Sequence, residues 1–226
     1  MRHCTDYLSG LVLKVGILGT GMVGNAIGSK LVQLGHEVKM GSRTVSNVKA
    51  SEWVKTAGSR ASQGTFADAA DFGEIIFNCT AGSVSLEALK LAGSKNLAGK
   101  VLVDVANPLD FSKGMPPSLT VCNTNSLGEQ IQHAYPQTKV VKTLNTMNCR
   151  VMVNPSLVPG DHNVFVSGND SYAKSKITNI LKAFGWKNVI DLGDITAARG
   201  TEMLLPIWLR LMGVLGTTDF NFKIVK

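Results

Sequence analysis

The sequence contains few cysteines and no long apolar run, and these two scarcities exclude several classes of protein. Its 226 residues include four cysteines, none in a Cys-x-x-Cys pair and none with a histidine at metal-ligand spacing. We therefore expect reduced thiols in a cytoplasmic protein, with no metal site. The longest apolar stretch, residues 203–215, is interrupted by Pro206 and Arg210 and is too short to span a bilayer. It predicts a buried or interface helix, and the first eleven residues lack the pattern of a secretory signal.

The charge of the chain is unbalanced, with a formal net charge of +7 at pH 7. Lysine and arginine are scattered rather than clustered, which argues against a nucleic-acid partner. An anionic small molecule explains the excess more simply, because a dinucleotide with an extra phosphate is strongly negative. The sequence shows no solenoid repeat and no low-complexity segment, so its composition indicates a globular protein.

A glycine-rich turn lies between a predicted strand and a predicted helix near the start of the chain. Residues 13–18 (LKVGIL) form a short apolar run that is typical of a buried parallel strand. The motif GTGMVG follows at residues 19–24, then a helical pattern, then a second strand at residues 36–40. This order is the sequence context that makes a GxGxxG motif a strong indication of dinucleotide binding.

Each glycine of the motif has a separate physical role. Gly19 permits the tight turn, Gly21 lets a pyrophosphate approach the backbone, and Gly24 lets the helix pack closely on the strand. The helix N-terminus then offers free N–H groups and a positive dipole to the phosphates. The alternative interpretation is a glycine-rich turn without a ligand.

The end of the second strand predicts which dinucleotide is bound. NAD enzymes usually place a carboxylate there to bind the ribose 2′-hydroxyl. This chain instead has Ser42, Arg43 and Thr44, and a guanidinium flanked by hydroxyls suits a 2′-phosphate. The pattern therefore favours NADP(H) over NAD(H), although Arg43 could also be a solvated loop charge.

Three further loops are expected on the ligand side of the sheet. The sequence predicts more strands, alternating with helices, at residues 74–78, 101–105 and 139–144. Ligands bind beyond the carboxyl ends of such strands. Asn107 follows the second of these strands and either binds the nicotinamide end or is an ordinary turn residue before Pro108. The residues expected to contact the cofactor are Gly19, Thr20, Gly21, Met22, Val23, Gly24, Ser42, Arg43, Thr44, Thr80, Ala81, Gly82, Asn107 and Pro108.

The fold class predicted from these patterns is α/β, a Rossmann doubly wound parallel sheet with a second, smaller α+β C-terminal lobe. We expect the NADP-binding domain to cover residues 1–150 and the C-terminal lobe residues 151–226. The lobe is expected to cap the nicotinamide end of the cleft. A continuous apolar helix is predicted over residues 200–215, and it is expected to pack against a second subunit in a homodimer.

Four segments also carry a family resemblance: GTGMVG, LGHEVKMGSRT, KVVKTLNTMN and ARGTEMLLPIWLRLMG. On these the chain resembles the deazaflavin (coenzyme F420)-dependent NADP reductases across nearly its full length. The resemblance implies that Thr20, Met22, Ser42 and Arg43 contact NADP. It also implies an acceptor pocket lined by residues 145–148 and 202–206. The residues expected to bind the acceptor are Asn145, Met147, Asn148 and Glu202.

The family uses a lysine beyond the Ser-Arg pair to hold the 2′-phosphate. Counting from Ser42, the corresponding position falls near Asn47, and Lys49 lies two residues later. A similar domain occurs in the cytosolic part of membrane ferric reductases, whose transmembrane helices have no counterpart in this sequence.

The first functional hypothesis is hydride transfer between NADP(H) and a deazaflavin, a flavin or a similar small-molecule acceptor. Such a reaction needs positioning rather than a catalytic side chain, so no catalytic residue is expected and the four histidines are interpreted as structural. Two alternatives remain: a non-catalytic NADP(H)-binding redox sensor, and a reductase of a small carbonyl or imine compound, which would need a proton donor. A catalyst requires an open acceptor pocket beside Asn107, Asn145 and Met147, whereas a sensor could fill that space.

Overall fold

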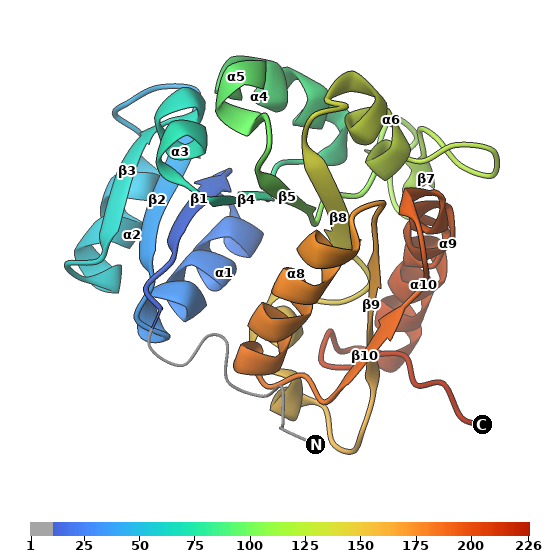
Figure 1. Ribbon diagram of the computed structural model, residues 1–226. Helices are drawn as coiled ribbons and strands as arrows, with labels where there is room; N and C mark the ends of the chain where they lie inside the picture. The colour runs from blue at the N-terminus through green and yellow to red at the C-terminus, as the bar shows by residue number, and fades with distance from the viewer. Residues whose placement is uncertain (1–10) are drawn as a thin grey trace, which may run out of the picture.

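The computed structural model describes residues 11–226, in which eight strands form one central sheet (Figure 1). The strands lie in the spatial order β10-β9-β8-β5-β4-β1-β2-β3. All neighbouring pairs are parallel except β8 and β9, which are antiparallel. Their bounds are β1 (Lys14–Leu18), β2 (Glu37–Ser42), β3 (Ala61–Thr65), β4 (Ile75–Asn78), β5 (Val101–Asp104), β8 (Lys139–Thr143), β9 (Asn163–Ser167) and β10 (Asn188–Asp191).

This order confirms the predicted doubly wound sheet. Strands β2 and β3 are added on one side of β1, and β4 and the later strands are added on its other side. Helices connect the parallel strands and cover both faces. They are α1 (Met22–Gln33), α2 (Val48–Ala57), α3 (Phe66–Phe72), α4 (Ser85–Ala92), α5 (Ser94–Leu97), α6 (Leu127–Ala134), α7 (Cys149–Val153), α8 (Ser171–Phe184), α9 (Ala198–Met203) and α10 (Leu205–Leu215). In Figure 1, α4, α5 and α6 lie along the upper side of the sheet, and α1 and α8 along the lower side.

Two apolar cores lie on the two faces of the sheet, because successive side chains of a strand point to opposite faces. In β1, Ile17 joins the core formed with α1, α2, α7 and α8, whereas Leu18 joins the core formed with α3, α4 and α6. The same alternation holds for Phe77 and Ile76 in β4. Burial on both faces explains why these strands are short continuous apolar runs in the sequence.

The segment after residue 150 continues the central sheet. Strands β9 and β10 extend it beyond β8, and α8 connects them. The predicted continuous helix over residues 200–215 is wrong, because it is interrupted at Leu204 between α9 and α10. Pro206 lies in the first turn of α10, where its missing N–H is tolerated but where it cannot continue the preceding helix. The capping and dimerising role of this lobe stays a prediction.

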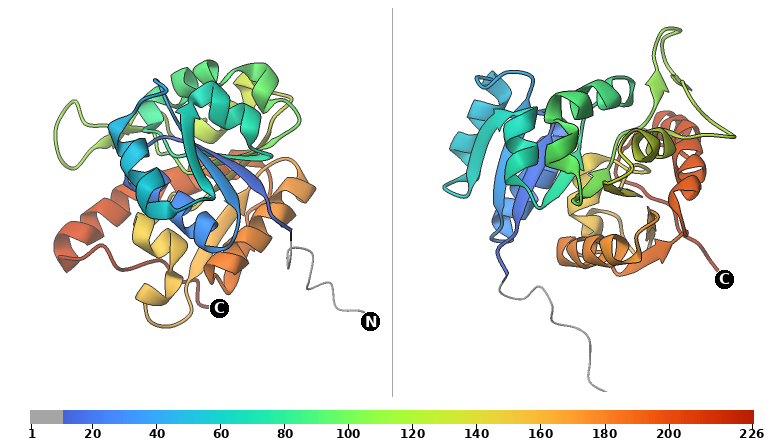
Figure 2. Two further views of the ribbon diagram at one scale, coloured as in Figure 1. Left: turned by 90° about the vertical axis from the view of Figure 1, so that its left-hand side faces the viewer. Right: turned by 45° about the horizontal axis from the view of Figure 1, so that its top comes forward.

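The segment between β5 and α6 contains a small ribbon. Strands β6 (Leu109–Asp110) and β7 (Ser118–Leu119) pair antiparallel, and Figure 2 shows this ribbon projecting from the body of the molecule. Within residues 11–226, no helix combines the length and the apolar character that crossing a bilayer requires.

Candidate functional site

A cleft of about 620 Å³ opens at the carboxyl ends of β1, β2 and β4, on the side where the first three loops of the sheet meet. It brings together Gly19 and Thr20 from the first loop with Thr80 from the loop after β4. Its complete lining is Gly19, Thr20, Ser42, Arg43, Thr44, Asn47, Phe66, Thr80, Val84, Glu87, Ala88 and Leu91. Six of the fourteen predicted cofactor residues therefore line one cavity, at the place where doubly wound folds bind dinucleotides.

The three motif glycines differ in what a side chain would meet. A Cβ at Gly24 would lie 2.2 Å from the carbonyl oxygen of Gly19, and Gly19 itself has φ +117°. At Gly21, in contrast, an added Cβ meets no protein atom within 4 Å. Gly19 and Gly24 are thus required by the fold, whereas the open space at Gly21 fits a ligand that approaches the N-terminus of α1. Gly21 caps this helix without a side chain, so the first N–H groups of α1 are available to a phosphate.

The end of β2 forms a tight turn that leaves Arg43 facing the cleft. The Ser42 hydroxyl donates to the carbonyl oxygen of Thr44 at 2.5 Å, which closes the turn. Within residues 11–226, no carboxylate forms an ion pair with the Arg43 guanidinium. A cation without an internal partner at this position suits the 2′-phosphate of NADP(H).

Asn47 lines the same end of the cleft as Arg43 and Thr44. Its Oδ1 accepts a hydrogen bond from the Ala50 N–H at 3.1 Å and thereby caps α2. This leaves the amide Nδ2 as a donor at the rim of the cavity. Motif spacing missed the other lining residues, Phe66, Val84, Glu87, Ala88 and Leu91, because they come from α3, α4 and the turn before α4 rather than from the loops.

The loops after β4, β5 and β8 contact one another beside the cleft. A Cβ at Gly82 would lie 2.0 Å from the carbonyl oxygen of Asn107, so the first two loops are in close contact. Asn107 and Asn145 exchange two hydrogen bonds, from Asn107 Nδ2 to the Asn145 carbonyl at 2.8 Å and from Asn145 Nδ2 to Asn107 Oδ1 at 3.0 Å. The structure therefore joins Asn107, which was predicted to bind the cofactor, to Asn145, which was predicted to bind the acceptor.

The remaining residues predicted to bind the acceptor have structural partners. Met147 is buried in the apolar core, and Asn148 caps α7 by accepting from the Arg150 N–H at 2.9 Å. Glu202 is buried, and its carboxylate accepts from the Leu127 and Gly128 N–H groups at the start of α6. Their contact with an acceptor stays a prediction.

Sequence reasoning missed a buried group of charges next to these loops. Lys142 Nζ lies 2.8 Å from Asp104 Oδ2 and 2.8 Å from Glu202 Oε1. Burial acts to lower the pKa of Lys142, but the two carboxylates outweigh it and raise that pKa above its ordinary value. The signal was a lysine and an aspartate inside apolar strand segments (KVVKT and VLVDV), where charged residues are rare.

The described histidines have structural surroundings. His36 is buried near the start of β2, and burial followed by the charge of Arg60 lowers its pKa. His133 is exposed on α6, and His3 lies outside the described residues. His162 Nδ1 lies 2.8 Å from Asn221 Nδ2, and its Nε2 lies 3.0 Å from the Pro155 carbonyl oxygen.

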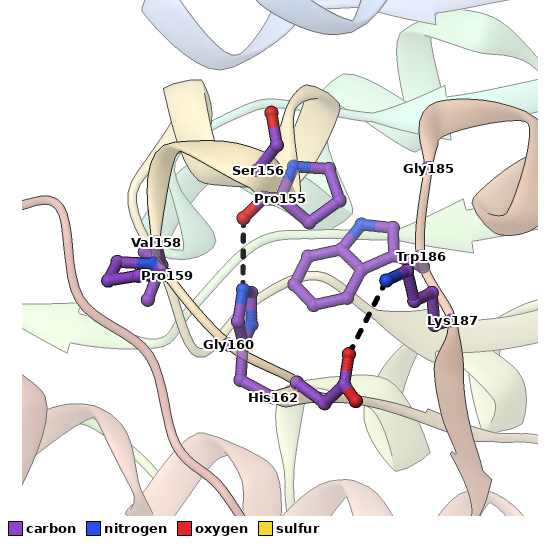
Figure 3. Close-up of a pocket in the computed structure, with 10 residues that line it drawn as sticks. Pro155, Ser156, Val158, Pro159, Gly160, His162, Gly185, Trp186 and Lys187 are labelled. Carbon is purple, nitrogen blue, oxygen red and sulfur yellow. Dashed lines mark hydrogen bonds and ion pairs between the residues drawn. The ribbon is translucent and has the colours of Figure 1, made fainter.

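His162 belongs to a second cavity of about 260 Å³ near the starts of β9 and β10 (Figure 3). Figure 3 shows His162 bonded to Pro155, with Trp186 and Lys187 on the other side of the cavity. Lys187 also forms an ion pair with Asp161 at 3.6 Å. Trp186 Nε1 donates to the Met152 carbonyl at 2.9 Å. The His162 and Trp186 rings are thus held by hydrogen bonds to the backbone and to Asn221.

The strand order, the glycine turn and the polar end of β2 are those of a Rossmann-like dinucleotide-binding fold, and comparisons with known proteins identify the family. A family model described as NADP oxidoreductase, coenzyme F420-dependent, matches residues 14–108. A solved structure from Arthrobacter sp. FB24, provisionally assigned as an F420-dependent NADP reductase, is 53% identical with a TM-score of 0.91 and covers 95% of this chain and 100% of that one.

Two curated relatives match over most of this chain. The F420-dependent NADP reductase of Methanocaldococcus jannaschii is 26% identical over 208 residues, which is 88% of this chain and 92% of that protein. The rat metalloreductase STEAP3 is 31% identical over 203 residues, which is 86% of this chain but 38% of that longer protein. The chain belongs to the family of coenzyme F420-dependent NADP oxidoreductases.

Proposed function

We propose that this protein transfers a hydride between NADP(H) and a deazaflavin or flavin acceptor. The observation that carries the proposal is the cleft beside the first glycine loop, in which Arg43 forms no ion pair within residues 11–226, together with the open space at Gly21 in that loop. The family supports the nicotinamide cofactor, and two relatives carry the name of F420-dependent NADP reductase. When bound, the cofactor supplies a hydride, two electrons with one hydrogen nucleus, and a solvent proton completes reduction of the acceptor.

The residues of the chain bind and orient the two partners in this proposal. The N-terminus of α1 binds the pyrophosphate across Gly21. Arg43, Thr44 and the free amide of Asn47 bind the 2′-phosphate. The Asn107–Asn145 pair offers carboxamide groups at the nicotinamide end. None of these groups donates or removes a proton, in keeping with a reaction that depends on alignment.

We also propose a homodimer that acts in the cytoplasm. Helix α10 exposes apolar side chains, with Ile207 51%, Val214 83% and Leu215 54% accessible, and such a stripe supports contact with a second copy. The three described cysteines, Cys79, Cys122 and Cys149, are free thiols, which supports a reducing compartment.

The test is anaerobic NADPH oxidation with a panel of acceptors: the deazaflavin coenzyme, FMN, FAD, a ferric chelate and a cyclic imine. We expect saturable turnover with the deazaflavin or a flavin, and faster turnover with NADPH than with NADH. Tight NADPH binding without turnover on any acceptor would contradict the proposal and favour a redox sensor. Turnover with the imine alone would contradict it in favour of the second alternative.

A further inference from the structure

Three charged side chains meet in the core directly before the loops that carry Asn107 and Asn145. The side chains of Lys142, Asp104 and Glu202 are 0%, 0% and 1% exposed. Burying such charges is unfavourable unless each polar atom finds a partner, and an apolar replacement is often as stable. Here the partners include backbone groups of the neighbouring loops, which points to a role in placing those loops.

The cluster holds both backbone polar groups of Ala106, the residue before Asn107. Asp104 Oδ1 accepts from the Ala106 N–H at 3.3 Å, and Lys142 Nζ donates to the Ala106 carbonyl oxygen. The peptide groups on either side of Ala106 are therefore fixed by the ion pair. These two contacts therefore set the position of the Asn107 backbone, from which the Asn107 side chain extends.

The loop after β8 begins two residues after the same lysine. Asn145 lies three residues after Lys142, and Leu144 between them has φ +62°, a left-handed conformation that residues with a side chain rarely adopt. Unfavourable backbone conformations of this kind collect at functional sites, where the surroundings hold them. The Asn107–Asn145 hydrogen bonds then connect the two loops across the site.

A chain of hydrogen bonds also links the cluster to the cofactor cleft. Asn78 Nδ2 donates to Asp104 Oδ1 at 2.8 Å, and the Thr80 hydroxyl donates to Asn78 Oδ1 at 2.7 Å. Thr80 lines the cleft. Hydrogen bonds thus connect the loops after β4 and β5 to one buried ion pair. The loop after β8 joins them through the Asn107–Asn145 hydrogen bonds.

We propose that Asp104 and Lys142 are positioning residues that align the Asn107–Asn145 pair with the nicotinamide end of the bound dinucleotide. This rests on the proposed function, because it presumes that NADP(H) occupies the cleft. Glu202 acts through Lys142 and the start of α6 rather than by touching the acceptor. The opposing explanation is that the cluster only stabilises the fold.

Binding measurements with two ligands distinguish the positioning role from a purely structural role, and they do not require turnover. NADPH has a nicotinamide end, whereas 2′,5′-ADP carries the adenosine and the 2′-phosphate but no nicotinamide. A positioning role predicts that Asp104→Asn, which is isosteric and leaves the Lys142–Glu202 pair intact, weakens NADPH binding by about tenfold, the effect of a small misplacement. Binding of 2′,5′-ADP should stay within about twofold.

The expected changes have a second readout in the ligand-free protein. Asp104→Asn should speed amide hydrogen exchange at Ala106 and Asn107, because it weakens the contact that holds the Ala106 N–H. Glu129→Gln is the matched control, since Glu129 also lies at the start of α6 and forms an ion pair but contacts neither loop. It should change neither the two affinities nor this exchange.

The outcomes divide as follows. Equal weakening of both ligands by Asp104→Asn, or no change in NADPH affinity and in exchange, would overturn the inference while leaving the proposed function in place. If the wild-type protein binds neither ligand, the proposed function itself fails. Should Asp104→Asn not fold, the triple variant Asp104→Asn, Lys142→Met and Glu202→Gln removes the three buried charges together, so that no buried charge is left without a partner, and the same two ligands are compared.

Discussion

Arg43 occupies the position where an NAD enzyme places a carboxylate, and it has no internal ion pair within the described chain. Arg43→Ala should weaken NADPH binding by about 1.5–3 kcal/mol, the usual range for hydrogen bonds to a charged group. NADH binding should hardly change, because NADH lacks the 2′-phosphate. Calorimetric titration with both cofactors measures the difference.

Lys55→Ala provides the control for this substitution. It removes the same charge from the far end of α2, where Lys55 is exposed and does not line the cleft. Equal losses of NADPH and NADH affinity in Arg43→Ala would show that Arg43 does not distinguish the two cofactors.

Gly21 and Gly24 should respond in opposite ways to the same added methyl group. Gly21→Ala has room in the protein, so stability should be unchanged while NADPH affinity falls by about tenfold or more through steric exclusion of the phosphates. Gly24→Ala places a Cβ against the Gly19 carbonyl oxygen and should lower the free energy of unfolding by about 1–3 kcal/mol. Denaturant unfolding and cofactor titration check both; a Gly21→Ala protein with full affinity would refute the placement of the pyrophosphate.

The sequence predicted the cleft residues that belong to a local strand–turn–helix motif. It missed the residues that tertiary packing brings to the cleft from distant parts of the chain. The glycine turn and Arg43 follow from a strand–turn–helix–strand pattern within about thirty residues, so spacing alone locates them. Phe66 and Glu87 line the same cleft from α3 and α4, and no local pattern connects them to it. The Lys142–Asp104 pair joins β8 to β5 and could be suspected only from charges inside apolar strands.

Among the elements, α6 and α9 are connected by an ion pair that should make stability depend on pH. Arg199 donates to the Glu129 carboxylate, and this hydrogen bond, against a smaller effect of burial, holds the pKa of Glu129 below its usual range. A carboxyl group with a lowered pKa contributes stability above its unfolded pKa of about 4.3, and this contribution is lost as the pH falls through the folded value.

Glu129→Gln should therefore destabilise the protein modestly at pH 7, and the difference from wild type should shrink towards zero on acidification below pH of about 4. Urea unfolding at both pH values measures the two differences. A difference that stays constant with pH would show that the carboxylate charge contributes nothing.

The N-terminus of α6 shows which capping contacts a local sequence pattern predicts and which it does not. Ser126 caps α6, as the sequence Ser-x-x-Glu favours, and accepts from the Glu129 N–H at 3.1 Å. The Glu129 carboxylate, however, contacts the Ser126 hydroxyl and Arg199, while the Ser126 N–H donates to Asn125. Arg199 is seventy residues away in sequence, so the local pattern could not reveal the competing partner.

Other elements escaped prediction for related reasons. Strand β3 (Ala61–Thr65, ASQGT) lies at the edge of the sheet and has almost no apolar residues, so it lacks the signal that revealed the central strands. The break at Leu204 was hidden inside a long apolar run, even though Pro206 was visible there.

In the whole molecule, the parallel direction of β1, β2, β4 and β5 followed from alternating strands and helices, but the direction of β9 did not. A buried run such as NVFVS has the same composition whichever way it runs, and only its register against β8 shows that the pair is antiparallel. The last two strands therefore extend one sheet rather than forming a sheet of their own.

The exposed apolar stripe of α10 is the basis for a prediction about assembly. Val214→Asp and Ile207→Glu each place a charge in this stripe, and a dimer that buries it should dissociate into monomers at micromolar concentration. Sedimentation velocity measures the mass, and Lys182→Glu, an exposed charge change on α8, is the control. A wild-type protein that is already monomeric would contradict the proposed dimer.

The central claim is that the cleft holds NADPH so that its hydride passes to a deazaflavin or flavin. The most direct measurement uses NADPH carrying deuterium on one face of C4 of the dihydronicotinamide, with the deazaflavin coenzyme as acceptor, because a deazaflavin receives the hydride on carbon and retains the isotope. We predict that the label from one face alone appears in the reduced acceptor, as a fixed geometry requires. No transfer of deuterium to the deazaflavin from either face, together with no oxidation of bound NADPH by saturating FMN or FAD, would contradict the claim.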